Sequence, residues 1–132
     1  MRLFNAVVTP SVLYGCSSWA LTESKEKALA STQTKMVRWM MQKNRRLGTD
    51  GELEAWPTYV QRATQDARHA MREYKVVNWV EAYQKQKEKW KARVEQMDPE
   101  RWAFIAFDWQ PLGYRSQGRP RKRWSDDFSV LV

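Results

Sequence analysis

The sequence predicts an all-α protein, a small bundle of three to five helices followed by an extended tail rich in Pro, Gly and Arg. Two observations predict this class. Apolar residues recur at three- and four-residue steps along most of the chain, which is the period of an amphipathic helix. No segment shows the strict apolar–polar alternation that is typical of a strand. With 132 residues, 42% hydrophobic and 13% aromatic, the chain is large and apolar enough to fold as one domain.

The first element is an apolar segment over residues 2–18, in which Pro10 is expected to kink or restart a helix. Residues 3–22 carry no charge, but they include too many Ser, Thr, Asn and Gly residues for a transmembrane helix. They also lack the continuous apolar core of a signal peptide. We therefore expect a buried or docking segment, and membrane contact by residues 3–22 is the less favoured alternative.

Thr22 is the predicted N-cap of the next helix, which runs to about Gln42. Basic residues are favourable near its C-terminus, and Gly48 follows as a stop. We expect one side of this helix to carry Leu29, Thr32, Met36, Trp39 and Met40.

Pro57 marks the first turn of a further helix. Its amphipathic stripe is formed by Val60, Ala63, Ala67, Ala70, Met71, Tyr74 and Val77. The pattern continues through Trp79, Tyr83, Trp90, Val94 and Met97. The chain over this stretch is therefore either one long helix or two helices with a break near Asn78.

Asp98-Pro99-Glu100 is typical of a helix start, with an acidic cap followed by proline. Its predicted inward face consists of Trp102, Ile105, Ala106 and Trp109. We therefore assign residues 1–109 to a helical domain. Residues 110–132 form a basic extended tail, in which Pro and Gly exclude regular helix until Ser125 caps a last short turn.

Charge and cysteine content limit the function classes. Lys and Arg number 23 against 15 Asp and Glu, and the net charge of +8 favours a polyanionic partner over a merely basic surface. Cys16 is the only cysteine, so no internal disulfide can form, and an intracellular, reducing compartment is favoured. Cys16 is expected to be a small buried side chain and His69, the lone histidine, to be solvated.

Three blocks resemble the reverse transcriptases of non-LTR, RTE-like retrotransposons. Residues 12–22, VLYGCSSWALT, resemble the segment that follows the palm and opens the thumb. Residues 90–102, WKARVEQMDPERW, are similar to a stretch near the C-terminus, although Ala92-Arg93 and Gln96 replace the family's Gly-His and Arg. Residues 109–127 resemble its closing pattern W-x-P-x-G-x-R-x-x-G-R-P-x-x-R-W-x-D-D. The resemblance implies a thumb and C-terminal region without palm or endonuclease.

This resemblance implies a chain without catalytic activity. The family polymerises DNA with palm carboxylates that hold two metal ions, in a Tyr-x-Asp-Asp type motif between strands. Asp126-Asp127 follows Trp124-Ser125 and has no flanking apolar strands, so it does not supply that motif. No glycine-rich loop opens a helix in the phosphate-cradling pattern. We predict no enzyme activity, no cofactor, no metal and no small-molecule substrate.

The resemblance to a thumb implies a sequence-tolerant grip on a nucleic-acid backbone, either RNA or DNA. Arg and Lys neutralise phosphates, and Trp stacks on bases. The predicted binding residues are Arg115, Arg119, Arg121, Lys122, Arg123 and Trp124 in the tail, with Lys43, Arg45 and Arg46 after the first long helix. The alternative for the tail is that Trp124 packs on the helical core while the arginines pair with acidic groups.

A second function class stays open. In this alternative the chain is a small structural or accessory subunit of a large protein assembly, in a membrane or a ribonucleoprotein. The aromatic excess and the charge-free N-terminal stretch favour it, whereas the intact basic tail favours nucleic acid.

Overall fold

The computed structural model describes residues 1–109, 118 and 122–127, and over these residues the chain is helical, as predicted. A single antiparallel bridge joins Leu47 to Leu53, and no strand occurs in the described ranges. The α-helices are α1 (Thr9–Val12), α2 (Glu23–Met40), α3 (Trp56–Glu73), α4 (Trp79–Glu95) and α5 (Trp102–Asp108). A π-helical segment covers Phe4–Val8, and short 3₁₀ turns cover Cys16–Ser18 and Ser125–Asp127.

The N-terminal helix changes type just before Pro10, where the sequence predicted a kink or restart. The π-helical segment Phe4–Val8 ends there, and α1 takes over with Pro10 in its first turn. Proline has no N–H to give to the carbonyl four residues earlier, and its ring crowds that carbonyl. A widened π turn at this place relieves both problems. Gly15, in the left-handed conformation at φ 64°, then turns the chain into the 3₁₀ segment.

Helix α2 begins after Thr22 as predicted, although the Thr22 side chain makes no capping hydrogen bond. Its predicted inner face is wrong in part. Gln33 and Val37 are the buried positions, whereas Thr32 and Met40 are exposed and Trp39 is 63% exposed. The packed face is rotated because Gln33 makes hydrogen bonds with the start of α4 and the link before it, while Val37 belongs to the hydrophobic core.

A break separates α3 from α4, which decides between the two predicted alternatives. The Asn78 side chain accepts a hydrogen bond from the N–H of Val80 at 3.0 Å and so caps α4. The small side chains of Ala63, Ala67 and Ala70 are buried as expected. Tyr74 and Val77 are exposed instead, because α3 ends at Glu73 and these residues no longer follow its stripe.

Helix α5 differs from the prediction in two respects: the residue at which it begins and the side that packs inward. The Asp98 carboxylate accepts a hydrogen bond from the N–H of Glu100, so Asp98 caps a turn and the helix begins at Trp102. Trp102 is 84% exposed. Ile105, Ala106 and Trp109 are exposed as well. Phe107 lies inward instead and meets Trp124 edge-on with 5.5 Å between ring centroids. Helix α5 has only seven residues and carries apolar residues on two sides. The Phe107–Trp124 contact therefore determines which of these sides packs inward.

The core centres on Trp79, the first residue of α4, whose side chain is fully buried. Its ring stacks on Phe4 at 5.7 Å with an interplanar angle of 2°. Its indole N–H donates to the Thr9 hydroxyl at 3.0 Å. The backbone N–H of Trp79 donates to the Gln33 side-chain oxygen, and the Gln33 amide donates to the carbonyl of Val77 at 2.6 Å. Three segments far apart in the sequence are therefore joined at one residue.

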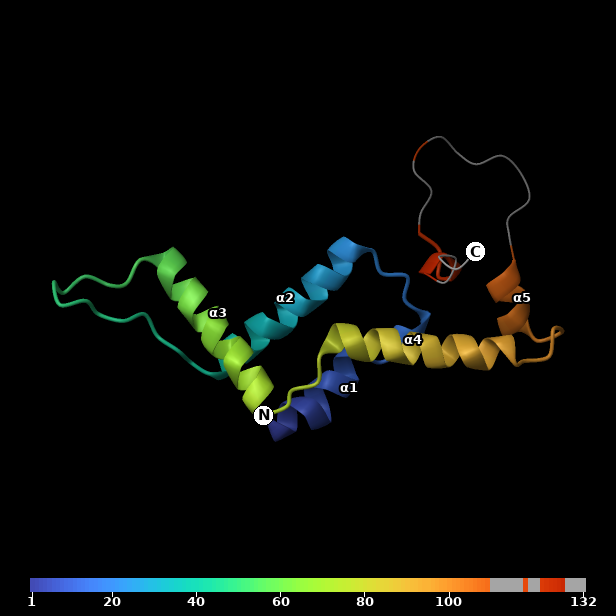
Figure 1. The fold of residues 1–132 in the computed structure, drawn as a ribbon, viewed down its shortest axis with the longest axis horizontal. Coiled ribbons are helices and arrows are strands. Elements are labelled where there is room, and N and C mark those ends of the chain that lie inside the picture. Colours follow the sequence, from blue (N-terminus) through green and yellow to red (C-terminus); the bar gives the residue numbers. More distant parts are fainter. Residues whose placement is uncertain (110–117, 119–121, 128–132) are drawn as a thin grey trace.

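The helices form two arms that meet at this core (Figure 1). Helices α2 and α3, with the loop over residues 41–55 between them, lie on one side. The C-terminal half of α4 and α5 lie on the other, and the N-terminal helix packs beneath the junction.

Replacement of Gln33 by Ala is expected to lower the free energy of unfolding by about 1–3 kcal/mol, because it removes the partners of the Trp79 N–H and the Val77 carbonyl. Gln84, exposed on α4, is the matched control, and its replacement by Ala is expected to change stability by less than about 0.5 kcal/mol. Urea denaturation followed by circular dichroism measures both. Equal losses in the two variants would contradict a role for Gln33 at this junction.

Candidate functional site

Three predicted tail residues, Arg115, Arg119 and Arg121, lie outside the described residues. Two of the others pack against the segment that leads into α2. The Lys122 ammonium donates to the carbonyl of Leu21 at 2.6 Å, and the Trp124 indole N–H donates to the carbonyl of Ser17 at 2.6 Å. Both side chains are half-buried. For Trp124 the arrangement matches the packing alternative raised from the sequence.

Arg123 is half-buried as well, and its backbone N–H donates to the Asp126 carboxylate at 2.7 Å. This hydrogen bond closes the last 3₁₀ turn, where the sequence predicted a short turn beginning at Ser125.

The second predicted basic set lies in the loop over residues 41–55. The Arg45 guanidinium donates to the carbonyls of Glu54, at 2.7 Å through Nε, and of Leu53, so its hydrogen bonds hold the loop together. The Lys43 ammonium lies 3.9 Å from the Asp66 carboxylate, and the Arg46 side chain is exposed. Of these three predicted cations, Arg45 thus makes the most hydrogen bonds within the described part of the protein.

An ion pair between Glu54 and Arg62 ties this loop to α3. The Arg62 guanidinium reaches the Glu54 carboxylate at 2.6 Å, and both side chains are largely covered. The hydrogen bond from Arg62 is the main cause that lowers the pKa of Glu54 to about 2, with a further contribution from the backbone N–H of Arg46. Glu54 is therefore charged in the folded protein down to strongly acidic pH.

Lys87 is a buried cation that no feature of the sequence indicated. It is 3% exposed. The ammonium donates to the carbonyl of Trp19 at 3.0 Å and to the Tyr83 hydroxyl at 3.2 Å. It also lies 5.6 Å from the ring centroids of Tyr83 and Trp124. Lys87 thus links the C-terminal segment, α4 and the connection between the 3₁₀ segment and α2.

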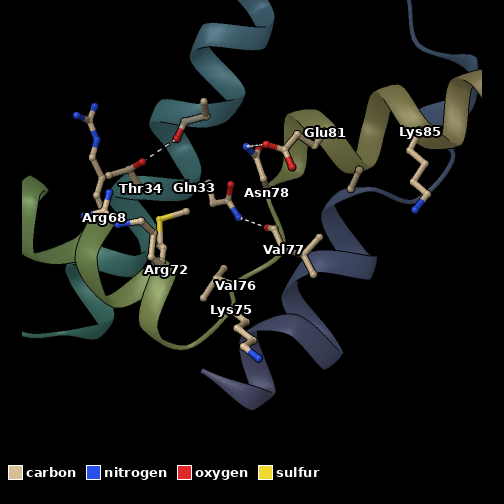
Figure 2. Close-up of a pocket in the computed structure, with 13 residues that line it drawn as sticks. Gln33, Thr34, Arg68, Arg72, Lys75, Val76, Val77, Asn78, Glu81 and Lys85 are labelled. Atoms are coloured by element: carbon tan, nitrogen blue, oxygen red, sulfur yellow. Dashed lines mark hydrogen bonds between the residues drawn. The ribbon is translucent and has the colours of Figure 1, made fainter.

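A groove of about 700 Å³ lies where α2, α3 and the start of α4 meet (Figure 2). Four cations line it: Arg68 and Arg72 from α3, Lys75 from the link, and Lys85 from α4. Glu81 is the one carboxylate among the lining residues, and it accepts a hydrogen bond from the Asn78 amide. The other lining residues are Ala30, Gln33, Thr34, Met71, Val76, Val77, Asn78 and Ala82.

The four cations of this groove differ from Arg45, Lys87 and Lys122 in having no protein partner for their charge. Within the described part of the chain, their side chains form no salt bridge and no hydrogen bond. Lys75 occupies a left-handed conformation at φ 48° just after α3, and its carbonyl accepts a hydrogen bond from the Asn5 amide at 3.1 Å. Sequence reasoning missed the set because its members are spread over residues 68–85 and form no basic run.

Cys16 and His69 lie as the sequence predicted. Cys16 is buried, its thiol donates to the Gln86 side chain at 3.1 Å, and burial raises its pKa. His69 is exposed, with the Glu73 carboxylate 3.7 Å away. No group of three or more His, Cys, Asp or Glu side chains is arranged to hold a metal ion in the described ranges. None of the helices that the structure describes is long and apolar enough to cross a membrane.

No protein-family model, curated protein or solved structure matches this chain. The resemblance to retroelement reverse transcriptases therefore stays a prediction from the motifs.

The Glu54–Arg62 pair predicts a defined acid sensitivity. The pKa of Glu54 in the folded protein, about 2, lies below its ordinary value of 4.5, so the pair stabilises the fold fully above pH 4.5. This contribution disappears as the pH falls from about 4.5 toward 2. We expect Glu54→Gln to lower the melting temperature at pH 7 and to bring it closer to the wild-type value at pH 3.

Glu52→Gln is the matched control, because the Glu52 side chain is exposed in the same loop. It is expected to follow the wild-type melting curve at both pH values. A melting temperature for Glu54→Gln that stays parallel to the wild type between pH 7 and pH 3 would contradict the assignment.

Proposed function

We propose that this chain binds the phosphate backbone of RNA or DNA without catalysing a reaction, and that the groove at the junction of α3 and α4 is its main contact. The observation that carries the proposal is the convergence of Arg68, Arg72, Lys75 and Lys85, whose charges have no partner among the described residues. Such cations exchange bound counterions for phosphates, which is the dominant driving force of backbone binding.

The chemistry of the groove suits a polymer of phosphates more than a single small anion. Its cations come from α3, the link and α4, and Figure 2 shows them spread around the groove. A chain of phosphates can meet several such charges in succession, whereas one small anion would meet few of them. The net charge of +8 and the resemblance to a thumb support the same proposal.

The tail residues Arg115, Arg119, Arg121 and Arg123 remain part of the proposal as a second backbone contact. Lys122 and Trp124 anchor the described part of this segment to the chain just before α2. These two residues are therefore proposed to position the neighbouring arginines, and Trp124 is not expected to stack on a base.

Salt dependence distinguishes the groove from a general basic surface. The variant with Arg68, Arg72, Lys75 and Lys85 all replaced by Gln is expected to bind a labelled oligonucleotide more weakly. The slope of log affinity against log salt should become shallower by about 0.7–0.9 for each phosphate that the variant no longer neutralises. Fluorescence anisotropy titrations at several salt concentrations measure this slope.

The matched control replaces Lys25, Lys89, Arg93 and Arg101 by Gln. It also removes two lysines and two arginines from exposed positions, but these lie outside the groove. We expect its slope to stay close to that of the wild type. Equal slopes in the two variants would refute the groove as the site, and a shallower slope in Arg119→Ala/Arg121→Ala/Arg123→Ala alone would locate the contact in the tail instead.

A second candidate function, as a subunit of a larger assembly, is favoured by exposed apolar surface. Thirteen large apolar side chains are exposed among the described residues, against ten buried apolar ones. Contiguous exposed apolar surface marks protein contacts. Leu3, Val7 and Tyr14 lie exposed near the N-terminus, and Trp102 and Ile105 lie exposed on α5.

This second candidate predicts that the isolated chain self-associates. Sedimentation velocity should then reveal concentration-dependent species, and Trp102→Ser/Ile105→Ser should shift them toward monomer. A cooperatively melting monomer at all concentrations would count against the subunit function.

A further inference from the structure

A second groove, of about 520 Å³, runs along α3 from Trp56 to Arg68. Arg68 lines both this groove and the cationic groove, so the two meet at that residue. The lining of the second groove is Trp56, Pro57, Val60, Gln61, Thr64, Gln65 and Arg68. The second groove therefore has an aromatic side chain, Trp56, at one end and one cation, Arg68, at the other.

The residues of the two grooves form a continuous stripe that winds around α3. Trp56, Val60, Thr64, Arg68 and Arg72 recur at four-residue steps, so each side chain lies next to the following one while the stripe turns about 40° around the helix axis at each step. At 1.5 Å per residue, this stripe extends about 24 Å along the helix axis from Trp56 to Arg72. We call this surface the α3 track. Its length is sufficient for several consecutive nucleotides.

Trp56 has the exposure and the support of a stacking platform. Its side chain is 62% exposed. Its ring lies 5.4 Å from the Tyr59 ring, and the Arg62 guanidinium lies 5.8 Å from the same Tyr59 ring. The Tyr59 hydroxyl donates to the carbonyl of Lys43 at 2.8 Å, which ties Tyr59 to the loop. Because Tyr59 is held in this way, the platform rests on a fixed element.

We infer that the nucleic acid bound by this chain is single-stranded, with a base stacked on Trp56 and its phosphates following the α3 track to Arg68 and Arg72. This inference rests on the proposed function and specifies the substrate class of the same site. In a duplex the faces of the bases are covered by their neighbours, so an exposed indole ring has nothing to stack on except a terminal pair. In a single strand every base offers a face, and stacking on an aromatic ring adds to the contacts with phosphates.

The polar side chains between Trp56 and Arg68 suit binding that does not depend on the base sequence of the strand. Gln61, Thr64 and Gln65 line the middle of the second groove and carry amide and hydroxyl groups that both donate and accept hydrogen bonds. The lining of this second groove contains no carboxylate that would repel phosphates. An anionic membrane would also meet the cations, but it has no base to stack on Trp56.

The test compares binding of the full 132-residue chain to a labelled single strand of oligo-dT, about 12 nucleotides long, and to a duplex of the same length, by fluorescence anisotropy. We expect tighter binding to the single strand. Trp56→Ala should weaken single-strand binding by roughly 5- to 150-fold and leave duplex binding unchanged, whereas Trp56→Phe should retain most of the affinity. The matched control is Trp102→Ala, exposed on α5, which should bind as the wild type does.

The outcomes separate the two proposals. Duplex binding as tight as single-strand binding, with Trp56→Ala unaffected, overturns the single-strand inference and leaves backbone binding standing. Absence of binding to both oligonucleotides overturns the proposed function itself. Equal weakening in Trp56→Ala and Trp56→Phe overturns stacking, and binding to phosphatidylserine vesicles in place of both oligonucleotides assigns the grooves to a membrane surface.

Discussion

The burial of Trp79 sets the geometry on which the other helices depend. An indole ring carries one N–H that must find a partner when it is covered, and the backbone N–H at the start of a helix has no partner within that helix. Thr9 accepts from the first group and Gln33 from the second, so the N-terminal helix and α2 both meet α4 at this point. Phe4 then closes over the ring by stacking. Any change that moved α4 would leave these polar groups without partners in the core.

The same junction forms the cationic groove. Asn5 accepts a hydrogen bond from the N–H of Val77 and donates to the carbonyl of Lys75, both at 3.1 Å, while Gln33 holds the carbonyl of Val77. These hydrogen bonds fix the link between α3 and α4. Because the link is fixed, Arg72 at the end of α3 and Lys85 on α4 line the same groove. Fold and candidate site therefore depend on one set of hydrogen bonds.

Local signals in the sequence predicted where α2, α3 and α4 begin and which side of α3 packs, but not which side of α2 or α5 packs. Pro57 and Asn78 mark the starts of α3 and α4, since first-turn prolines and N-caps act through the nearest backbone groups. On α2 the side with Trp39 is more apolar, but Gln33 is buried because its amide satisfies two backbone groups at the start of α4 and in the link before it. On α5 the packed side is chosen by Trp124, which is distant in the sequence. Where a helix has two apolar sides, such distant partners decide between them.

The candidate site was harder to predict, because a sequence shows which residues are charged but not which groups their side chains contact in the folded protein. Arg45, Lys87 and Lys122 each donate to backbone carbonyls, and Arg62 pairs with Glu54. Each of these cations has exchanged its hydration for protein contacts, so a phosphate would have to displace those contacts to reach it. The four cations of the groove are exposed, and their side chains make no such contacts within the described part of the chain. A basic run in the sequence therefore does not tell which cations the fold leaves without carbonyl or carboxylate partners.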